Sequence, residues 1–426
     1  MRPRPTFFGP GVVRGAFVMA MFGWGVGFYG PPIFLQAVLQ RTGWPLEWVS
    51  AAVTAHFAFG ALVIVMLPRW HRRFGVGPVA VAGALCTSAG IFGWAVACAP
   101  WQLFAAAAVS GAGWVTMGAV AVNAAIAPWF ARARPVALAK AYNGASIGGV
   151  LFSPLWAWLI PGIGFAAAAA VIGLAMTAVM AWLARAAFAV TPASLGQTVD
   201  GDAEVATTAS ASAAVSPRAL ARPLPRGLPW CDRRFVTLAS AMALSLFAQI
   251  GLIAHLFSLL VPVFGGQAAA WAMSLATACA IGGRLLAARI LAAGAGRRAT
   301  AAISCGVQLV GTLTLLVASA QQPALILVAV ALFGAGIGNA TSLPPLIAQD
   351  EFAQEDVARV VSLIVALSQA TYAFAPMAFG FVLAASGSGS AAIGQGAGTL
   401  LLGVALVQGS AILCCLAAGQ SARSAR

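Results

Sequence analysis

Long runs of apolar residues, separated by short polar breaks, dominate this chain. A helix needs about 20 apolar residues to cross the hydrocarbon core of a bilayer. Runs of that length predict twelve spans, six on each side of one long polar stretch. They cover residues 12–38, 47–67, 77–97, 101–127, 137–160, 164–188, 234–262, 268–293, 299–319, 324–348, 358–384 and 394–418. The pattern predicts an all-α membrane protein with 12 transmembrane helices.

Basic residues fall in alternate loops. Arg72 and Arg73 follow the second predicted span and Arg132 and Arg134 follow the fourth, whereas the break at 99–100 is uncharged. Because cytoplasmic loops carry the excess of Lys and Arg, both termini are expected to be cytoplasmic. Composition agrees: 61% of the residues are hydrophobic and 8% are charged, against about 25% charged in soluble domains. A soluble nucleic-acid-binding protein is thereby excluded, despite the net charge of +14.

The polar stretch divides the chain. This stretch contains acidic residues, an Ala/Ser/Thr run and several arginines. It has too few large apolar side chains to form a hydrophobic core. We therefore expect an N-terminal six-helix bundle over 1–188 and a flexible cytoplasmic linker over 189–233. A C-terminal six-helix bundle with a short cytoplasmic tail is expected over 234–426.

The two predicted bundles resemble each other. Gly111-Ala112-Gly113 recurs as Gly334-Ala335-Gly336 at an offset of 223, and both Phe130 and Pro154 recur at an offset of 222. Together with the equal number of spans, these matches predict a parallel duplication related by an axis along the membrane normal, as in major facilitator transporters.

Two stretches carry a family resemblance. The run Gly23-Trp24-Gly25-Val26-Gly27-Phe28-Tyr29-Gly30 and the loop 129–137, which leads into the glycine-rich run 144–149, resemble the two signatures of the monocarboxylate transporter family. The oxalate:formate antiporters are related, and the group lies within the major facilitator superfamily. The resemblance implies two six-helix bundles in the major facilitator fold and a substrate-binding arginine at Arg284. The acidic residues of mammalian members are replaced, at one position by Ala280.

Arg284 is the one charged residue in the middle of a predicted span, and all nine acidic residues lie outside the apolar interior. A charge there is costly, and a guanidinium matches a carboxylate. Arg284 is therefore expected to bind the substrate carboxylate. The alternative is an arginine that reaches the cytoplasmic interface.

Other polar residues in the spans are candidates for the same cavity or for helix–helix packing. The substrate-binding candidates are Tyr29, Asn123, Asn143, Gln369 and Tyr372, with Tyr142 and Asn339 as further cavity-lining candidates. His56 and His255 are candidates for proton coupling, because histidine titrates near neutral pH; the alternative is a neutral histidine with satisfied hydrogen bonds. Arg72, Arg73, Arg132 and Arg134 are candidates for gating loops, or anchor the cytoplasmic side.

The predicted function is secondary transport of a small, monocarboxylate-like organic anion across the bacterial inner membrane by alternating access. The alternative is a drug or neutral-solute exporter. A serine hydrolase with Ser146 in a Gly-x-Ser-x-Gly motif is disfavoured, because that motif lies within a helical span. We expect no cofactor, no metal and no nucleic acid. The expected partners are the anion, a proton or counter-anion, and the lipid bilayer, with the protein acting as a monomer.

Overall fold

The computed structural model describes residues 7–201, 229–385, 393 and 396–417. Within these ranges the regular structure is helical, and eleven helices are long and apolar enough to span a membrane. The longest, α9 (Arg233–Ala292), contains the non-helical residue Gly265, with φ 75° and ψ 167°. Since two predicted spans meet there, the structure confirms the twelve-span prediction. The tail after residue 417 and most of the predicted linker lie outside the described residues.

The chain divides into two compact units. Unit 1 takes in residues 1–34 and 55–216, and unit 2 takes in residues 35–54 and 217–426. The contacts thus group residues 35–54 with unit 2, although these residues lie within the predicted N-terminal bundle. This segment contains most of α2 (Pro31–Thr42) and the start of α3 (Leu46–Phe74).

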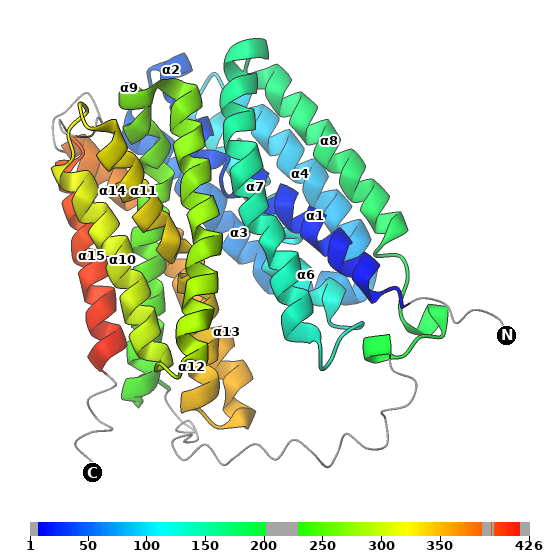
Figure 1. Ribbon diagram of the computed structural model, residues 1–426. Coiled ribbons are helices and arrows are strands. Elements are labelled where there is room, and N and C mark those ends of the chain that lie inside the picture. Colours follow the sequence, from blue (N-terminus) through cyan, green and yellow to red (C-terminus); the bar gives the residue numbers. More distant parts are fainter. Residues whose placement is uncertain (1–6, 202–228, 386–392, 394–395, 418–426) are drawn as a thin grey trace, which may run out of the picture. The chain divides into compact units, whose positions relative to one another are not determined.

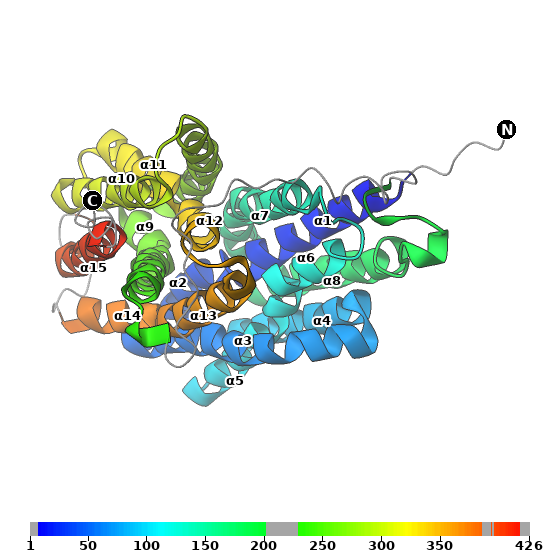
Figure 2. The same cartoon turned by 90° about the horizontal axis from the view of Figure 1, so that it is seen from below.

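Unit 1 contains the rest of α3 and five further spans. Their helices are α1 (Gly9–Gly27), α4 (Val76–Val96), α5 (Pro100–Trp114), α6 (Ala119–Ile126), α7 (Arg134–Ile163) and α8 (Phe165–Ala186). Helix α1 packs along α7 (Figure 1), and α4 packs between α5 and α8 (Figure 2). The core of unit 1 includes Phe34, Trp94 and Trp156, which are almost completely buried.

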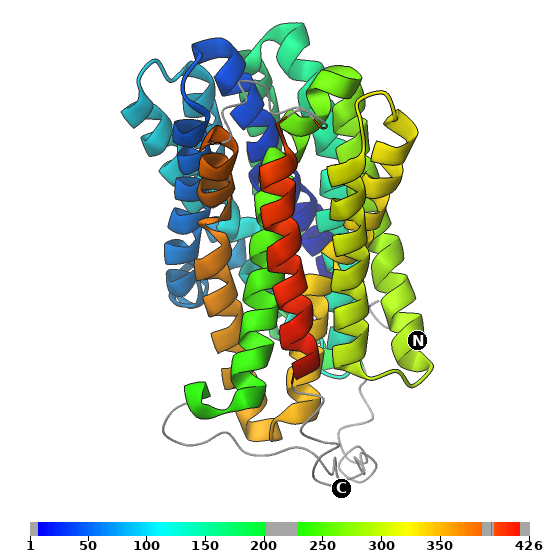
Figure 3. The ribbon, with the colours of Figure 1, turned by 90° about the vertical axis from the view of Figure 1, so that its left-hand side faces the viewer.

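Unit 2 contains α9 and the helices that follow it. These are α10 (Arg297–Val317), α11 (Pro323–Ile337), α12 (Asn339–Glu351), α13 (Gln354–Tyr372), α14 (Ala375–Ala385) and α15 (Gly398–Ala417). Helix α15, red in Figure 3, runs alongside α10 and the first half of α9. Within the described residues, a large core cluster gathers Phe235, Leu343, Phe352 and Ile364.

Glycines allow the same close helix contact in both units. A Cβ added at Gly111 would lie 1.9 Å from the carbonyl oxygen of His56, and one at Gly334 would lie 2.3 Å from that of Ala276. Since neither backbone oxygen can move freely, each position requires glycine. The repeated glycines noted in the sequence thus serve matching contacts, α5 on α3 in unit 1 and α11 on α9 in unit 2.

Several spans are broken near their middle. The span of α5 and α6 is interrupted by a 3-10 turn, η1 (Val115–Met117), and by Gly118 with φ −84° and ψ −160°. The junction of α11 and α12 at Gly338 is milder, because Gly338 keeps φ −68° and ψ −23°. Irregular backbone in a membrane is tolerated where it is buried in protein or lines a cavity. Discontinuous helices of this kind form the substrate sites of many secondary transporters.

Candidate functional site

Arg284 lies beside the break between α11 and α12. It is half-buried in the second half of α9, eight residues before the end of that helix, or about 12 Å along its axis at the usual rise. A Cβ added at Gly338 would lie 2.6 to 2.8 Å from Cγ, Cδ and Nε of Arg284. The Arg284 side chain therefore packs directly on the backbone where α11 meets α12, and glycine at 338 makes room for it.

Polar side chains gather at the same break. Asn339 is 5% exposed, and its side-chain amide donates to the carbonyl oxygen of Gly283 at 3.3 Å and to Ser304 Oγ at 2.9 Å. Ser342 Oγ donates to the Gly338 carbonyl at 3.0 Å. The structure thus holds Asn339 next to the residue that precedes Arg284.

Gln369 and Tyr372 lie on α13 and are each partly exposed. Tyr372 packs against the core cluster of unit 2, which includes Ala340 and Leu343 of α12. Both predicted residues thus belong to unit 2, the unit that contains Arg284.

The unit 1 candidates are Tyr29, Asn123 and Asn143. The Asn123 side-chain amide donates to the Tyr142 hydroxyl at 2.6 Å, and the Tyr142 ring meets Trp24 edge-on at 6.2 Å. Asn143 is exposed, next to Tyr142 on α7. Tyr29 is 7% exposed and packs edge-on against Phe28, with ring centroids 5.0 Å apart.

His56 has neutral partners for both ring nitrogens. It is 2% exposed; Nδ1 lies 2.9 Å from Ser110 Oγ, and Nε2 lies 2.8 Å from the Gly27 carbonyl oxygen. Its ring stacks on Trp114 with 14° between the planes. A proton on Nε2 that is donated to Gly27 leaves Nδ1 to accept from Ser110, which satisfies the neutral ring fully.

His255 is satisfied on one side. It is completely buried in the first half of α9, and Nε2 lies 3.0 Å from the carbonyl oxygen of Pro376 in α14. Nδ1 is buried with no hydrogen-bond partner, and so are the hydroxyls of Ser50 and Ser258. A Cβ added at Gly380 would lie 2.6 Å from Ser50 Oγ and 3.6 Å from His255 Cε1, so both side chains border the same point.

The basic loop 131–134 binds a carboxylate from the predicted linker. The backbone N–H groups of Ala131, Arg132 and Ala133 donate to the Asp200 carboxylate at 2.9 to 3.3 Å. Desolvation raises the pKa of Asp200, but these hydrogen bonds and the Arg132 charge outweigh it and hold the pKa below its usual value. Arg72, Arg73, Arg132 and Arg134 are exposed, and their gating role stays a prediction.

Sequence reasoning gave no role to three features of these regions. Trp24 lay within a signature motif without a role of its own, Asp200 lay in a stretch predicted to be flexible, and nothing in the sequence placed Ser50 near His255. Only the glycine-rich signature containing Trp24 could have directed attention to the first. Asp200 contacts residues that are 67 to 69 positions away in the sequence. Local sequence patterns cannot predict contacts over such a separation.

The Gly-x-Ser-x-Gly motif belongs to a helix interface. A Cβ added at Gly144 would lie 2.0 Å from the carbonyl oxygen of Phe17, and one at Gly148 would lie 2.3 Å from that of Met21. Both glycines let α7 approach α1, and Ser146 between them is buried within α7. The strand–turn–helix of a nucleophile elbow is not formed here.

Comparison with known proteins places the chain among transporters. A search of curated proteins finds no significant match. Among solved structures, the nucleoside transporter NupG is similar with a TM-score of 0.70 and 11% identity, over 95% of this chain and 98% of that one. A bacterial homolog of the human lysosomal transporter Spinster, inward-facing and occupied, has a TM-score of 0.63 and 13% identity, over 98% and 95%. The sequence matches the Major Facilitator Superfamily over residues 15–376, so the chain belongs to that superfamily and is a multi-pass secondary transporter, not an enzyme.

Proposed function

We propose that this protein carries a small, monocarboxylate-like organic anion across the bacterial inner membrane by alternating access, with Arg284 binding the substrate carboxylate. The observation that supports this most is the position of Arg284 against the α11–α12 break at Gly338. Interrupted helices supply substrate contacts in secondary transporters, and a guanidinium presents a planar fork of donors that matches a carboxylate.

The surroundings of Arg284 favour a polar ligand over an apolar one. Asn339, Ser304 and Ser342 lie at the same break, and Gln369 and Tyr372 of α13 are the further polar candidates of unit 2. Tyr29, Asn143 and the Asn123–Tyr142 pair are the corresponding candidates in unit 1. Such a set suits a carboxylate with a short polar or apolar body.

For coupling we propose His255 rather than His56. A proton added to His56 Nδ1 would reverse the hydrogen bond with Ser110, whose hydroxyl would then donate to the Ala107 carbonyl oxygen, whereas the open Nδ1 of His255 can take a proton with no such rearrangement and keep the hydrogen bond to Pro376. The hydroxyl of Ser50 borders the same point and can accept from a protonated Nδ1. Residues 46–54 of unit 2, α14 and α15 carry one charged side chain in their described parts. It is Glu47, which is partly exposed.

Uptake by proteoliposomes tests the proposal. Saturable uptake of labelled monocarboxylates is expected for the wild type and for Arg289→Ala, an exposed arginine on the same helix. Arg284→Ala should lower uptake at least about tenfold, because a charge-assisted hydrogen bond to the substrate is lost. Arg284→Lys should fall between, since lysine keeps the charge but loses the planar fork.

Other results would overturn the proposal in identifiable ways. Uptake that is the same in wild type and Arg284→Ala removes the arginine as the anchor. Transport of apolar or neutral compounds, with no anion taken up, establishes the drug or neutral-solute exporter instead.

A further inference from the structure

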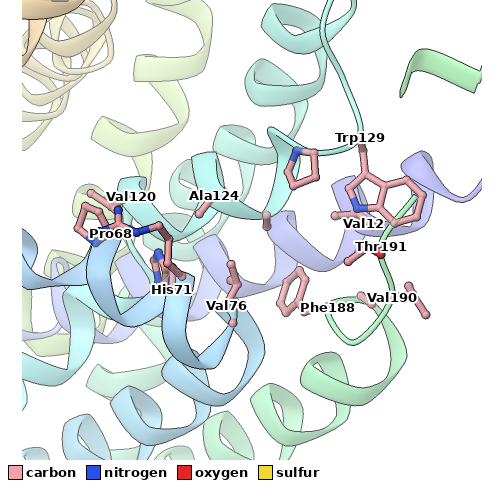
Figure 4. Close-up of a pocket in the computed structure, with 15 residues that line it drawn as sticks. Val12, Pro68, His71, Val76, Val120, Ala124, Trp129, Phe188, Val190 and Thr191 are labelled. Atoms are coloured by element: carbon pink, nitrogen blue, oxygen red, sulfur yellow. The ribbon is translucent and has the colours of Figure 1, made fainter. Parts of the chain in front are cut away.

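A cavity of about 500 Å³ lies within unit 1, at the ends of α3 and α6 that border the basic loops. Its walls are mostly apolar and come from α1, α3, α4, α6 and the segment after α8. Figure 4 shows His71 at one end of the cavity and Trp129 and Thr191 at the other. The volume is within the range of pockets that bind small molecules.

The polar groups of this cavity are basic at one end. His71 and Arg72 both line it, and none of its lining residues is acidic. Both ring nitrogens of His71 are buried and have no hydrogen-bond partner. Buried polar atoms in native proteins are paired with protein, water or a ligand. The imidazole N–H of His71 and the guanidinium of Arg72 can donate to an anion in the cavity.

The matching positions of unit 2 carry ion pairs. Helices α4 and α10 begin directly after Gly75 and Gly296, so Val76 corresponds to Arg297. In unit 2, Arg297 Nε lies 2.7 Å from Asp350 Oδ2. Arg298 Nη2 donates to Glu351 Oε2 at 2.8 Å.

In unit 1 the acidic partners are replaced as well. Phe130 and Phe352 match at the offset of 222, so Pro128 and Trp129 stand where Asp350 and Glu351 stand. Val76, Pro128 and Trp129 all line the cavity. Unit 1 thus has uncharged residues at positions where unit 2 has ion-paired side chains, while Arg72 and His71 lie at the neighbouring end of α3.

The outer wall comes from the start of the predicted linker. Phe188, Val190 and Thr191 line the cavity, and hydrogen bonds hold the segment that follows to the rest of unit 1. The backbone N–H of Phe8 donates to Gln197 Oε1 at 3.0 Å, and Asp200 binds loop 131–133. We refer to residues 188–201 as the strap.

We propose that this cavity binds the headgroup of an anionic phospholipid, with its phosphate between His71 and Arg72 and its glycerol and first acyl carbons against the apolar walls. The cavity lies at the end of the α3 span, where headgroups are found, and Trp129 is of the residue type enriched at that level. The absence of acidic lining residues favours a net negative headgroup. The cavity is too small for a whole lipid, so the acyl chains extend into the bilayer.

Binding of short-chain phosphatidylglycerol to the purified full-length protein in neutral detergent, followed by native mass spectrometry, tests this proposal. Short-chain phosphatidylcholine, which has no net charge, serves as the matched lipid. Saturable binding at one site, at least about tenfold tighter for phosphatidylglycerol, is expected. Arg72→Ala should remove most of that preference, whereas Arg73→Ala, an exposed neighbour outside the cavity, should change it by less than about twofold.

A second pair of variants tests the location. Ala124→Phe fills the cavity and should weaken binding of phosphatidylglycerol, whereas Ala127→Phe, one turn away on the same segment and outside the lining, should not. Equal binding of the two lipids overturns the anion preference. Equal losses in Arg72→Ala and Arg73→Ala reduce the effect to general surface charge and overturn the site. Undiminished binding in a folded Ala124→Phe variant overturns the location.

Discussion

The two units are built from the same kinds of helix, yet they satisfy their polar groups differently. Unit 2 neutralises its basic loop internally, through Arg297–Asp350 and Arg298–Glu351, but leaves His255 with an open ring nitrogen. Unit 1 gives His56 two partners, and Asp200 of the strap caps its loop 131–133. The duplicated fold therefore fixes helix packing, while the placement of charge is free to diverge.

The largest effect on this comparison is expected from the histidines. His56→Ala should lower the stability of unit 1 by about 3 kcal/mol, because it opens a cavity and removes the hydrogen bonds of the imidazole to the Gly27 carbonyl and Ser110. Thermal unfolding in detergent measures this change. His255→Asn should unfold near the wild-type temperature but lose any stimulation of uptake by an inward proton gradient.

The opposite pattern would reverse the assignment of roles. If His56→Gln abolishes the stimulation of uptake by protons while His255→Asn retains it, then His56 is the coupling group, although both of its ring nitrogens have hydrogen-bond partners. A gradient without effect on the wild type points to exchange of anions and removes both histidines from coupling.

A smaller effect is expected at the unit 2 ion pairs. Glu351→Ala should destabilise unit 2 by about 2 kcal/mol, because the partly buried Arg298 loses two charge-assisted hydrogen bonds. The midpoint of thermal unfolding provides the measurement. Glu355→Ala removes an exposed carboxylate four residues later and should be nearly neutral. Equal effects of the two variants would mean that the Arg298–Glu351 pair contributes no more than a surface charge.

The smallest effect is expected at Asp200, which is exposed. Asp200→Asn should raise the hydrogen-exchange rate of the amides of 131–133 and leave the midpoint of thermal unfolding almost unchanged. Because the folded pKa of Asp200 lies below its usual value of 3.8, the contribution of the carboxylate is complete above pH 3.8. It is lost as the pH falls below that value through the folded pKa. Exchange rates in Asp200→Asn that equal those of the wild type would show that the strap is held by other contacts.

The spans and their repetition were predictable because both depend on local sequence. Twenty apolar residues must form a helix in lipid, since no water is present to satisfy the backbone, and the glycines at 111 and 334 mark where two helices touch. The breaks within spans were less visible. Gly338 and the 115–118 turn lie inside continuous apolar runs, so hydropathy alone could not place the ends of α5, α6, α11 and α12.

The sequence by itself determined the class of this protein: twelve apolar runs, basic loops on alternate breaks and a duplicated glycine pattern lead to a major facilitator transporter. Only the tertiary structure decided which polar groups have partners. Both ring nitrogens of His56 have hydrogen-bond partners, but only one of those of His255 does. Asp200 accepts hydrogen bonds from loop 131–133, and unit 1 has a cavity at positions that match the ion pairs of unit 2. The physical reason is range: hydropathy acts over one helix, whereas hydrogen bonds and ion pairs join residues tens of positions apart.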